Sequence, residues 1–139
     1  MRVIVASSRS RPVLDAHALA AVKAATKGWH QPNGRLKTFV TTTGATFHLR
    51  TYKGHSAEWF FGIADRFWQQ GEFFVLVCSG NPTVFVVPVD ELLPHRQNFS
   101  LDKHGSRKLK IDRSSFGWKL RQVPSLPLAR YRDAFDLLT

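Results

Sequence analysis

The side chains that could carry chemistry in this 139-residue chain are its histidines, its single cysteine and its acidic residues. The six histidines are scattered, and no pair has the four-residue helical spacing of a zinc site. Cys78 ends the apolar run that begins at Phe73, which predicts a small core residue rather than a nucleophile. Glycine-rich phosphate loops and the serine-hydrolase elbow are also absent from the sequence. The common metal, nucleotide and nucleophile signatures are therefore missing.

The acidic residues are distributed in a way that disfavours hydrolysis. Phosphodiester hydrolysis usually needs carboxylates that hold Mg²⁺. Residues 16–57 contain no Asp or Glu, yet they carry six Lys or Arg side chains and four histidines. This stretch offers a row of phosphate contacts and no hard oxygen side chain for a metal. We therefore expect no cofactor, with Mg²⁺ required only if the protein is a nuclease.

The basic residues form two blocks. The chain has 20 Lys and Arg against 10 Asp and Glu, a net charge of +10. Residues 1–57 carry +8, residues 58–95 carry −4 and residues 96–124 carry +6. If both basic blocks fold onto one face, they form a groove that follows phosphates, the alternative being two solvated basic faces without a partner.

The side chains that we expect to contact nucleic acid divide into two walls of this groove. The first wall would be Arg35, Lys37, His48, Arg50, Lys53 and His55. The second wall would be Lys108, Lys110, Arg113 and Lys119.

The elements that must position these side chains follow from hydrophobic periodicity and turn residues. A single domain over residues 1–139 is expected from the length, with a flexible basic lead-in over residues 1–11. Helical spacing predicts an N-terminal helix, a short turn of helix before Gly71, another before Pro94, and a C-terminal helix; these cover residues 13–27, 64–70, 90–93 and 128–138. Strands are predicted over residues 36–43, 45–52, 59–63, 73–78, 84–89, 109–111 and 118–120.

These elements predict an α/β (α+β) fold, in which a central mixed sheet of five to six strands is covered by the N-terminal and C-terminal helices. Alternation along residues 45–52 places Phe47 and Leu49 on one face and His48 and Arg50 on the other. The apolar runs 73–78 and 84–89 are typical of strands that are buried on both faces.

Four segments are similar to the PD-(D/E)xK restriction-endonuclease-like superfamily. The segment from Glu72 to Leu93 resembles its aromatic-rich strand, turn and V-F-V-V-P strand. Residues 47–51 resemble the strand that normally reads (E/Q)-x-K-(T/S), residues 59–63 the W-x-F strand, and residues 131–138 the closing helix. The resemblance implies a restriction-endonuclease-like fold and a bacterial nucleic-acid context.

The positions that carry catalysis in that superfamily hold other residues here. His48 and Arg50 stand where the family has Glu or Gln and then Lys, and Lys37 and Thr38 stand where it has a metal-binding Asp. An Arg keeps the positive charge but cannot act as a deprotonated base. We therefore expect a non-catalytic protein that binds double-stranded DNA, as an accessory or recognition subunit of a restriction or mobile-element system.

Two other functions remain open at this stage. One is an active metal-dependent DNA endonuclease with relocated ligands, in which Asp15, Glu58 and Asp65 would act beside Arg50. The other is a β-rich reader of modified DNA or an RNA-binding module that stacks bases on tryptophan, although most of the four tryptophans lie in apolar strands typical of a core.

The cellular setting is also an expectation. A single cysteine allows no intrachain disulfide and suits a reducing cytoplasm. No apolar run reaches the roughly 18 residues of a spanning helix, so no membrane association is expected. A homodimer, or a place in a larger restriction-system assembly, would fit a DNA-binding role.

Overall fold

The computed structural model describes residues 20, 29–30, 38–41, 44–53, 57–70, 72–79 and 83–138. The predicted lead-in 1–11 lies outside the described residues, and so does the predicted N-terminal helix 13–27 except for Ala20. Among the predicted site residues, Asp15, Arg35, Lys37 and His55 also lie outside them, and Lys53 is described by its backbone only.

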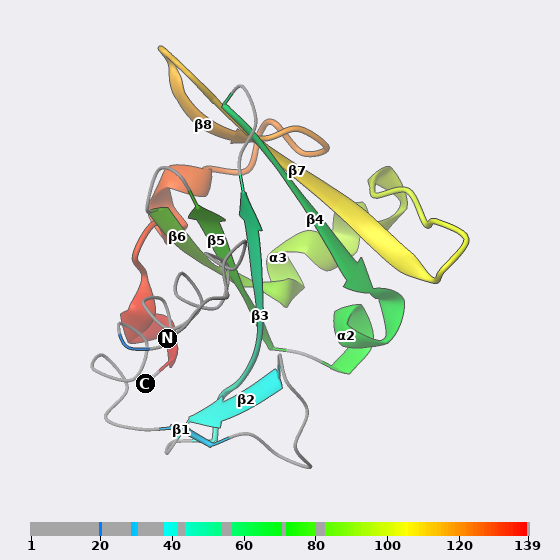
Figure 1. Ribbon diagram of the computed structural model, residues 1–139, viewed down its shortest axis with the longest axis vertical. Coiled ribbons are helices and arrows are strands. Elements are labelled where there is room, and N and C mark those ends of the chain that lie inside the picture. Colours follow the sequence, from blue (N-terminus) through cyan, green and yellow to red (C-terminus); the bar gives the residue numbers. More distant parts are fainter. Residues whose placement is uncertain are drawn as a thin grey trace, which may run out of the picture.

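A five-stranded mixed sheet forms one layer, with strand order β1-β2-β3-β5-β6 (Figure 1). Its strands are β1 (Trp29–His30), β2 (Thr38–Thr41), β3 (Thr46–Lys53), β5 (Phe73–Ser79) and β6 (Thr83–Pro88). β3 and β5 are parallel, and the other neighbours are antiparallel. The predicted strands 36–43 and 45–52 are confirmed as β2 and β3, which pair as an antiparallel hairpin, and Gly44 between them takes φ +93°, which favours glycine.

A three-stranded antiparallel sheet forms the second layer, with strand order β4-β7-β8 (Figure 1). Its strands are β4 (Glu58–Ala64), β7 (Ser106–Ser114) and β8 (Gly117–Leu120). The sequence predicted one central mixed sheet of five to six strands, whereas β4 lies in a separate sheet: it pairs with β7 along its whole length, from Glu58 opposite Asp112 to Ala64 opposite Ser106. The α+β class is confirmed, but the strands divide between two sheets.

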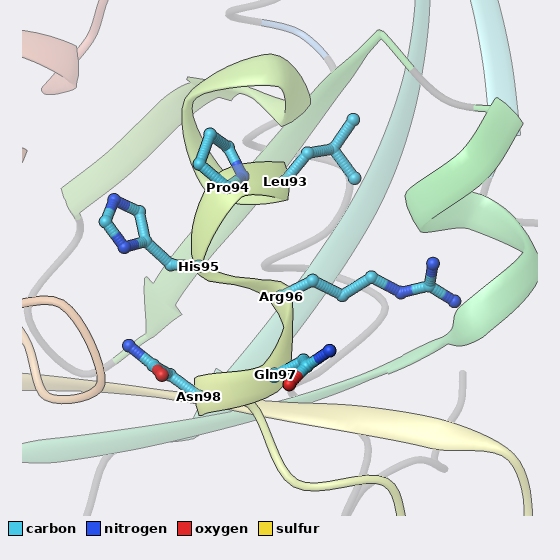
Figure 2. Close-up of a pocket in the computed structure, with 6 residues that line it drawn as sticks. All are labelled: Leu93, Pro94, His95, Arg96, Gln97 and Asn98. Atoms are coloured by element: carbon cyan, nitrogen blue, oxygen red, sulfur yellow. The ribbon is translucent and has the colours of Figure 1, made fainter.

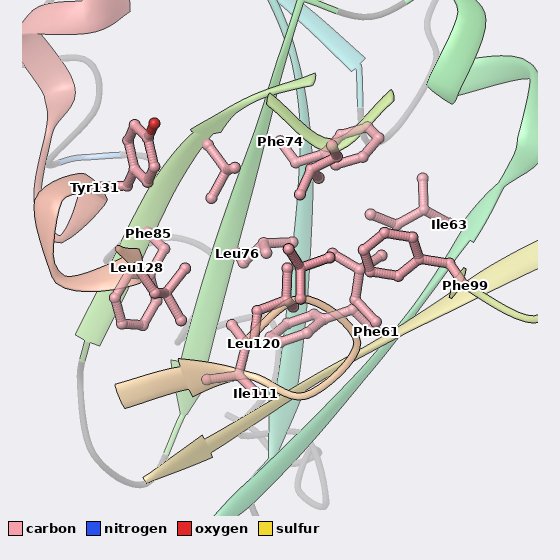
Figure 3. Packing of buried hydrophobic residues seen from close by; sticks show 14 of the residues in the cluster. Phe61, Ile63, Phe74, Leu76, Phe85, Phe99, Ile111, Leu120, Leu128 and Tyr131 are labelled. Carbon is pink, nitrogen blue, oxygen red and sulfur yellow. The ribbon is translucent and has the colours of Figure 1, made fainter. Parts of the chain in front are cut away.

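The main core lies between these two sheets (Figure 3). Alternate residues of β5 point into it, among them Phe74 and Leu76, and they meet Phe61 and Ile63 of β4 and Ile111 of β7. The intervening β5 residues face a second, smaller cluster on the other side of the five-stranded sheet, where they pack with β2, β3, β6 and the C-terminal segment. The prediction that this strand is buried on both faces is therefore confirmed.

Short helices connect the strands. The α-helix α2 (Asp65–Gln70) follows β4 at the predicted place. After β6 come α3 (Val89–Leu92) and the 3-10 helix η2 (Leu93–Asn98), where the sequence predicted only a helical turn over residues 90–93. Pro94 near the start of η2 is compatible with the tighter helix because a proline costs nothing in a first turn.

The predicted C-terminal helix 128–138 is wrong. Two 3-10 helices take its place, η3 (Leu128–Tyr131) and η4 (Phe135–Leu138). Between them Arg132 forms a β-bridge with Phe85, and the backbone N–H of Asp133 donates to the Val84 carbonyl at 2.8 Å. Asp133 takes φ +51°, which no continuous right-handed helix contains. Pairing with the edge of β6 has therefore replaced the helix.

Candidate nucleic-acid interface

The β7–β8 hairpin, here called the arm (Ser106–Leu120), carries all four basic residues of the predicted second wall. Leu109, Ile111 and Leu120 point into the core between the sheets. Since neighbouring residues of a strand alternate, Lys108, Lys110 and Lys119 lie on the opposite, outer face. The register agrees, because Asp112 of that face pairs with Lys119. The structure thus brings these three lysines together on one surface.

Lys110 contacts other residues of the protein and does not project into solvent. Its Nζ lies 2.7 Å from Glu58 Oε1 and 4.4 Å from the centre of the Phe60 ring, and the residue is only 9% exposed. The hydrogen bond from Lys110, together with the charges of Lys110 and Arg121, holds the pKa of the Glu58 carboxyl below its usual value. Lys110 is therefore inaccessible to a phosphate in this structure. The predicted contact between Lys110 and nucleic acid is wrong for this structure.

Arg121 completes a charge network beside the arm. Its guanidinium donates to both oxygens of Asp112, at 2.7 and 3.0 Å, and lies 3.6 Å from Glu58. Two cations, Lys110 and Arg121, thus face two carboxylates, Glu58 and Asp112, and this network is neutral.

Three exposed cations remain on the arm outside that network, namely Lys108, Arg113 and Lys119. Within the part of the chain that the structure describes, no salt bridge includes any of them. The Arg113 guanidinium lies 5.6 Å from the centre of the Trp118 ring, within the range of a cation–π contact. The arm therefore presents three exposed cations to solvent that form no salt bridge in the described part of the chain.

Two residues of the predicted first wall, His48 and Arg50, are described with their side chains, and they lie away from the arm, on β3. His48 and Arg50 of β3 are in register with Phe74 and Leu76 of β5, so they face the space between the sheets. His48 is 5% exposed, its ring stacks on Phe67 of α2 at 4.0 Å, and its Nδ1 lies 3.3 Å from Thr38 Oγ1. This burial conflicts with the expected phosphate contact of His48. Arg50 is half-buried and its Nε atom is buried.

The two described acidic residues of the endonuclease hypothesis, Glu58 and Asp65, are far apart. Glu58 begins β4 and Asp65 directly follows its end, so roughly 23 Å of extended chain separates them. Asp65 accepts hydrogen bonds of 2.6 Å from Arg107 Nε and from Arg96 Nη2, and these bonds lower its pKa. Among the described residues no group of three His, Cys, Asp or Glu side chains could hold a metal ion. Glu58 and Asp65 cannot share one.

A hollow of about 390 Å³ lies over η2 (Figure 2). All of its lining residues, Leu93 to Asn98, belong to this one short segment. Figure 2 shows that His95 and Arg96 extend in opposite directions from the backbone, and Arg96 reaches the ion pair with Asp65. The hollow thus combines no set of side chains that converge on a ligand.

Cys78 and the tryptophans have structural roles. Cys78 is fully buried, and burial raises the pKa of its thiol, so the predicted core role is confirmed. Trp59 and Trp68 are buried too, and Trp68 donates from its indole nitrogen to the Ile63 carbonyl at 3.3 Å. These two rings cannot form a stacking platform for bases.

The sequence patterns did not identify one exposed aromatic residue as a candidate site residue. Phe116 in the turn of the arm is 91% exposed. A lone apolar residue in a turn contributes to no periodic pattern, so hydrophobic periodicity cannot identify it. The available signal is the Ser-Ser-Phe-Gly turn itself, between two strands with basic residues.

Comparison with known proteins gives no further guidance. A scan of protein-family models, a search of curated proteins and a search of solved structures each found no match. The similarity to the PD-(D/E)xK superfamily therefore stays a prediction. Among the described helices, none is long and apolar enough to cross a membrane.

Proposed function

We propose that this protein is a non-catalytic nucleic-acid-binding protein that holds the phosphate backbone of double-stranded DNA with its β7–β8 arm. The observation that carries the proposal is the set of exposed cations on the arm, Lys108, Arg113 and Lys119, next to a charge network that is already neutral. Exposed cations that form no salt bridge can neutralise phosphates and release counterions, which is the main source of affinity for DNA.

The charge of the whole chain supports the same proposal. Residues 106–121 contain six basic side chains and one acidic side chain, within a protein of net charge +10. A surplus of this size destabilises a compact protein by self-repulsion, and a polyanionic partner offsets that repulsion. An accessory or recognition role in a restriction or mobile-element system is the biological setting that we propose.

The absence of catalysis is part of the proposal. The carboxylates Glu58 and Asp65 are each held by two cations and lie at opposite ends of β4. Binding Mg²⁺ would require these ion pairs to break, and each carboxylate would then supply only one ligand to an ion that prefers several oxygens.

The test is fluorescence anisotropy at low salt with a short labelled duplex, the matching single strand and RNA. We expect the double variant Lys108→Gln/Lys119→Gln to bind the duplex about tenfold more weakly or worse, because two charge-assisted contacts are lost. The matched control is Arg66→Gln/Arg132→Gln, which removes two exposed cations from α2 and the C-terminal segment. Equal loss in both variants, or no binding by the wild type, would contradict the proposal.

A further inference from the structure

The turn of the arm exposes an aromatic ring. Phe116 is 91% exposed, and the next most exposed large apolar side chain among the described residues, Leu101, is 53% exposed. The turn that joins β7 to β8 projects beyond the other described elements, at the top of the view in Figure 1. Phe116 therefore lies in the turn at the end of a protruding hairpin.

The geometry of the turn fixes the backbone beneath this ring. The backbone N–H of Phe116 donates to Ser114 Oγ at 3.1 Å. Gly117 takes φ +111°, a conformation that favours glycine and that reverses the chain immediately after Phe116. A ring held on a defined turn loses less conformational entropy on binding than one on a flexible loop.

The surroundings of the ring are cationic and polar. Arg113 and Lys119 are exposed on the strands just below the turn, and the other turn residues are Ser115, Ser114 and Gly117. A cationic arm that ends in one aromatic ring matches a ligand that has anionic groups on either side of a flat apolar surface. Nucleic acids have this chemistry, because each base presents a π-face between two phosphates.

We propose, on the basis of the proposed nucleic-acid binding, that Phe116 stacks on an unpaired base or inserts between two base steps, while Arg113 and Lys119 hold the flanking phosphates. Apolar side chains that insert in this way unstack the step and kink the duplex. The ligand class is thus a nucleic acid with bases that can be unstacked, such as a single strand or a deformable duplex.

An anionic lipid surface is the competing partner, and the turn fits it less well. Stable membrane attachment needs a substantial apolar area or a second anchoring signal. Phe116 is the only apolar residue among the four turn residues Ser114 to Gly117. One stacked ring, in contrast, is sufficient to engage a base.

The experiment compares Phe116→Ala with Phe116→Trp, and uses Leu101→Ala as the matched control for an exposed apolar residue elsewhere. The probes are a labelled single strand and a labelled duplex, each with one fluorescent adenine analogue that reports unstacking. We expect Phe116→Ala to weaken binding about fivefold or more and to abolish the change in analogue fluorescence. Phe116→Trp should retain both, and the melting temperature should be unchanged because the ring is exposed.

Three outcomes would overturn the proposal. If Phe116→Ala binds like the wild type while Lys108→Gln/Lys119→Gln binds weakly, the proposed function stands and stacking is wrong. If neither variant changes binding, both proposals are wrong. If Phe116→Ala reduces co-sedimentation with phosphatidylserine vesicles and leaves nucleic-acid binding unchanged, the ring contacts lipid instead.

Discussion

Arg107 and Asp65 join β7 to the start of α2 through a hydrogen bond of 2.6 Å between Arg107 Nε and Asp65 Oδ1. Arg107 Nη1 also donates to the carbonyl oxygen of Phe99 at 2.9 Å, and Arg96 of η2 donates to the second oxygen of Asp65. Three segments that are distant in sequence thus meet at one carboxylate. Asp65 is therefore a structural residue, whereas the endonuclease hypothesis made it a metal ligand.

Replacing Asp65 should destabilise the fold. We expect Asp65→Asn to lower the free energy of unfolding by about 1–3 kcal/mol, since two charge-assisted bonds are weakened and two arginines lose their carboxylate. Urea unfolding at neutral pH measures this difference. Asp90→Asn is the control, because Asp90 is exposed on α3.

The pH dependence of this difference has a defined sign. Arg107 and Arg96 lower the pKa of Asp65 in the folded state, so its stabilising effect is fully present above the unfolded pKa of about 3.9. The effect is lost as the pH falls through the folded pKa. The gap between the wild type and Asp65→Asn should therefore narrow below about pH 4. A gap that stays constant down to acidic pH would contradict this assignment.

The purified protein should not cleave DNA in the presence of Mg²⁺ or Mn²⁺. The reason is the separation of Glu58 from Asp65 along β4, with both carboxylates already paired. Incubation with supercoiled plasmid and gel analysis is the measurement. Cleavage that EDTA stops, and that Asp65→Asn or Glu58→Gln abolishes while Asp90→Asn does not, would establish the endonuclease hypothesis instead.

The sequence predicts those elements whose signal is local. Neighbouring residues alone are sufficient to predict some elements. Examples are the apolar runs of β5 and β6 and the glycine between β2 and β3. The alternation in β4 also predicts a strand, but the same alternation fits either sheet. Its partner, β7, begins 42 residues after β4 ends, and such long-range pairing leaves no periodic signal.

The C-terminal segment shows how a correct pattern can predict a wrong element. Leu128, Tyr131 and Leu138 are buried, as their spacing indicates. Two 3-10 helices bury these residues equally well, and the pairing of Asp133 with Val84 decides between the alternatives.

The charge pattern of the sequence selects the basic residues of the arm, but it does not show which of the lysines are exposed and which form ion pairs. Lys108 and Lys119 are exposed, whereas Lys110 pairs with Glu58. That pair joins two strands distant in sequence, so only the β4–β7 register reveals it.

Cys78 should be unreactive in the folded protein. It is fully buried in β5, and burial raises the pKa of its thiol, so both access and the thiolate fraction are suppressed. Alkylation with iodoacetamide, followed by mass spectrometry, should show no modification of the native protein and complete modification in denaturant. Asp65→Asn should react faster than the wild type, because its unfolded state is more populated. Rapid alkylation of the native wild type would contradict the burial of Cys78.

Nucleic-acid affinity should fall steeply as salt increases. About six phosphate contacts give a slope near −5 for the logarithm of the binding constant against the logarithm of the salt concentration. Lys108→Gln/Lys119→Gln removes two cations of the arm, so its slope should be shallower by about 1.8. Anisotropy titrations at several salt concentrations measure both slopes. Arg66→Gln/Arg132→Gln should keep the wild-type slope, and a flat response of the wild type would exclude a phosphate-based interface.

The sequence and the structure predict different roles for Arg50. The sequence predicts a phosphate contact, so Arg50→Ala would weaken DNA binding by about 1–3 kcal/mol and leave the melting temperature unchanged. In the structure Arg50 is half-buried, its Nε is buried, and it lies in register with Leu76 on the face between the sheets.

From this placement we expect Arg50→Ala to lower the free energy of unfolding by about 1–3 kcal/mol, because packing and polar interactions of a half-buried side chain are both lost. Arg50→Met keeps the apolar stem, so it should restore part of that stability. DNA affinity of both folded variants should match the wild type, since the arm lies on other strands. Thermal unfolding and anisotropy, measured on the same samples, decide between the two. A variant with normal stability and weakened binding would return Arg50 to the interface and place the phosphate near β3.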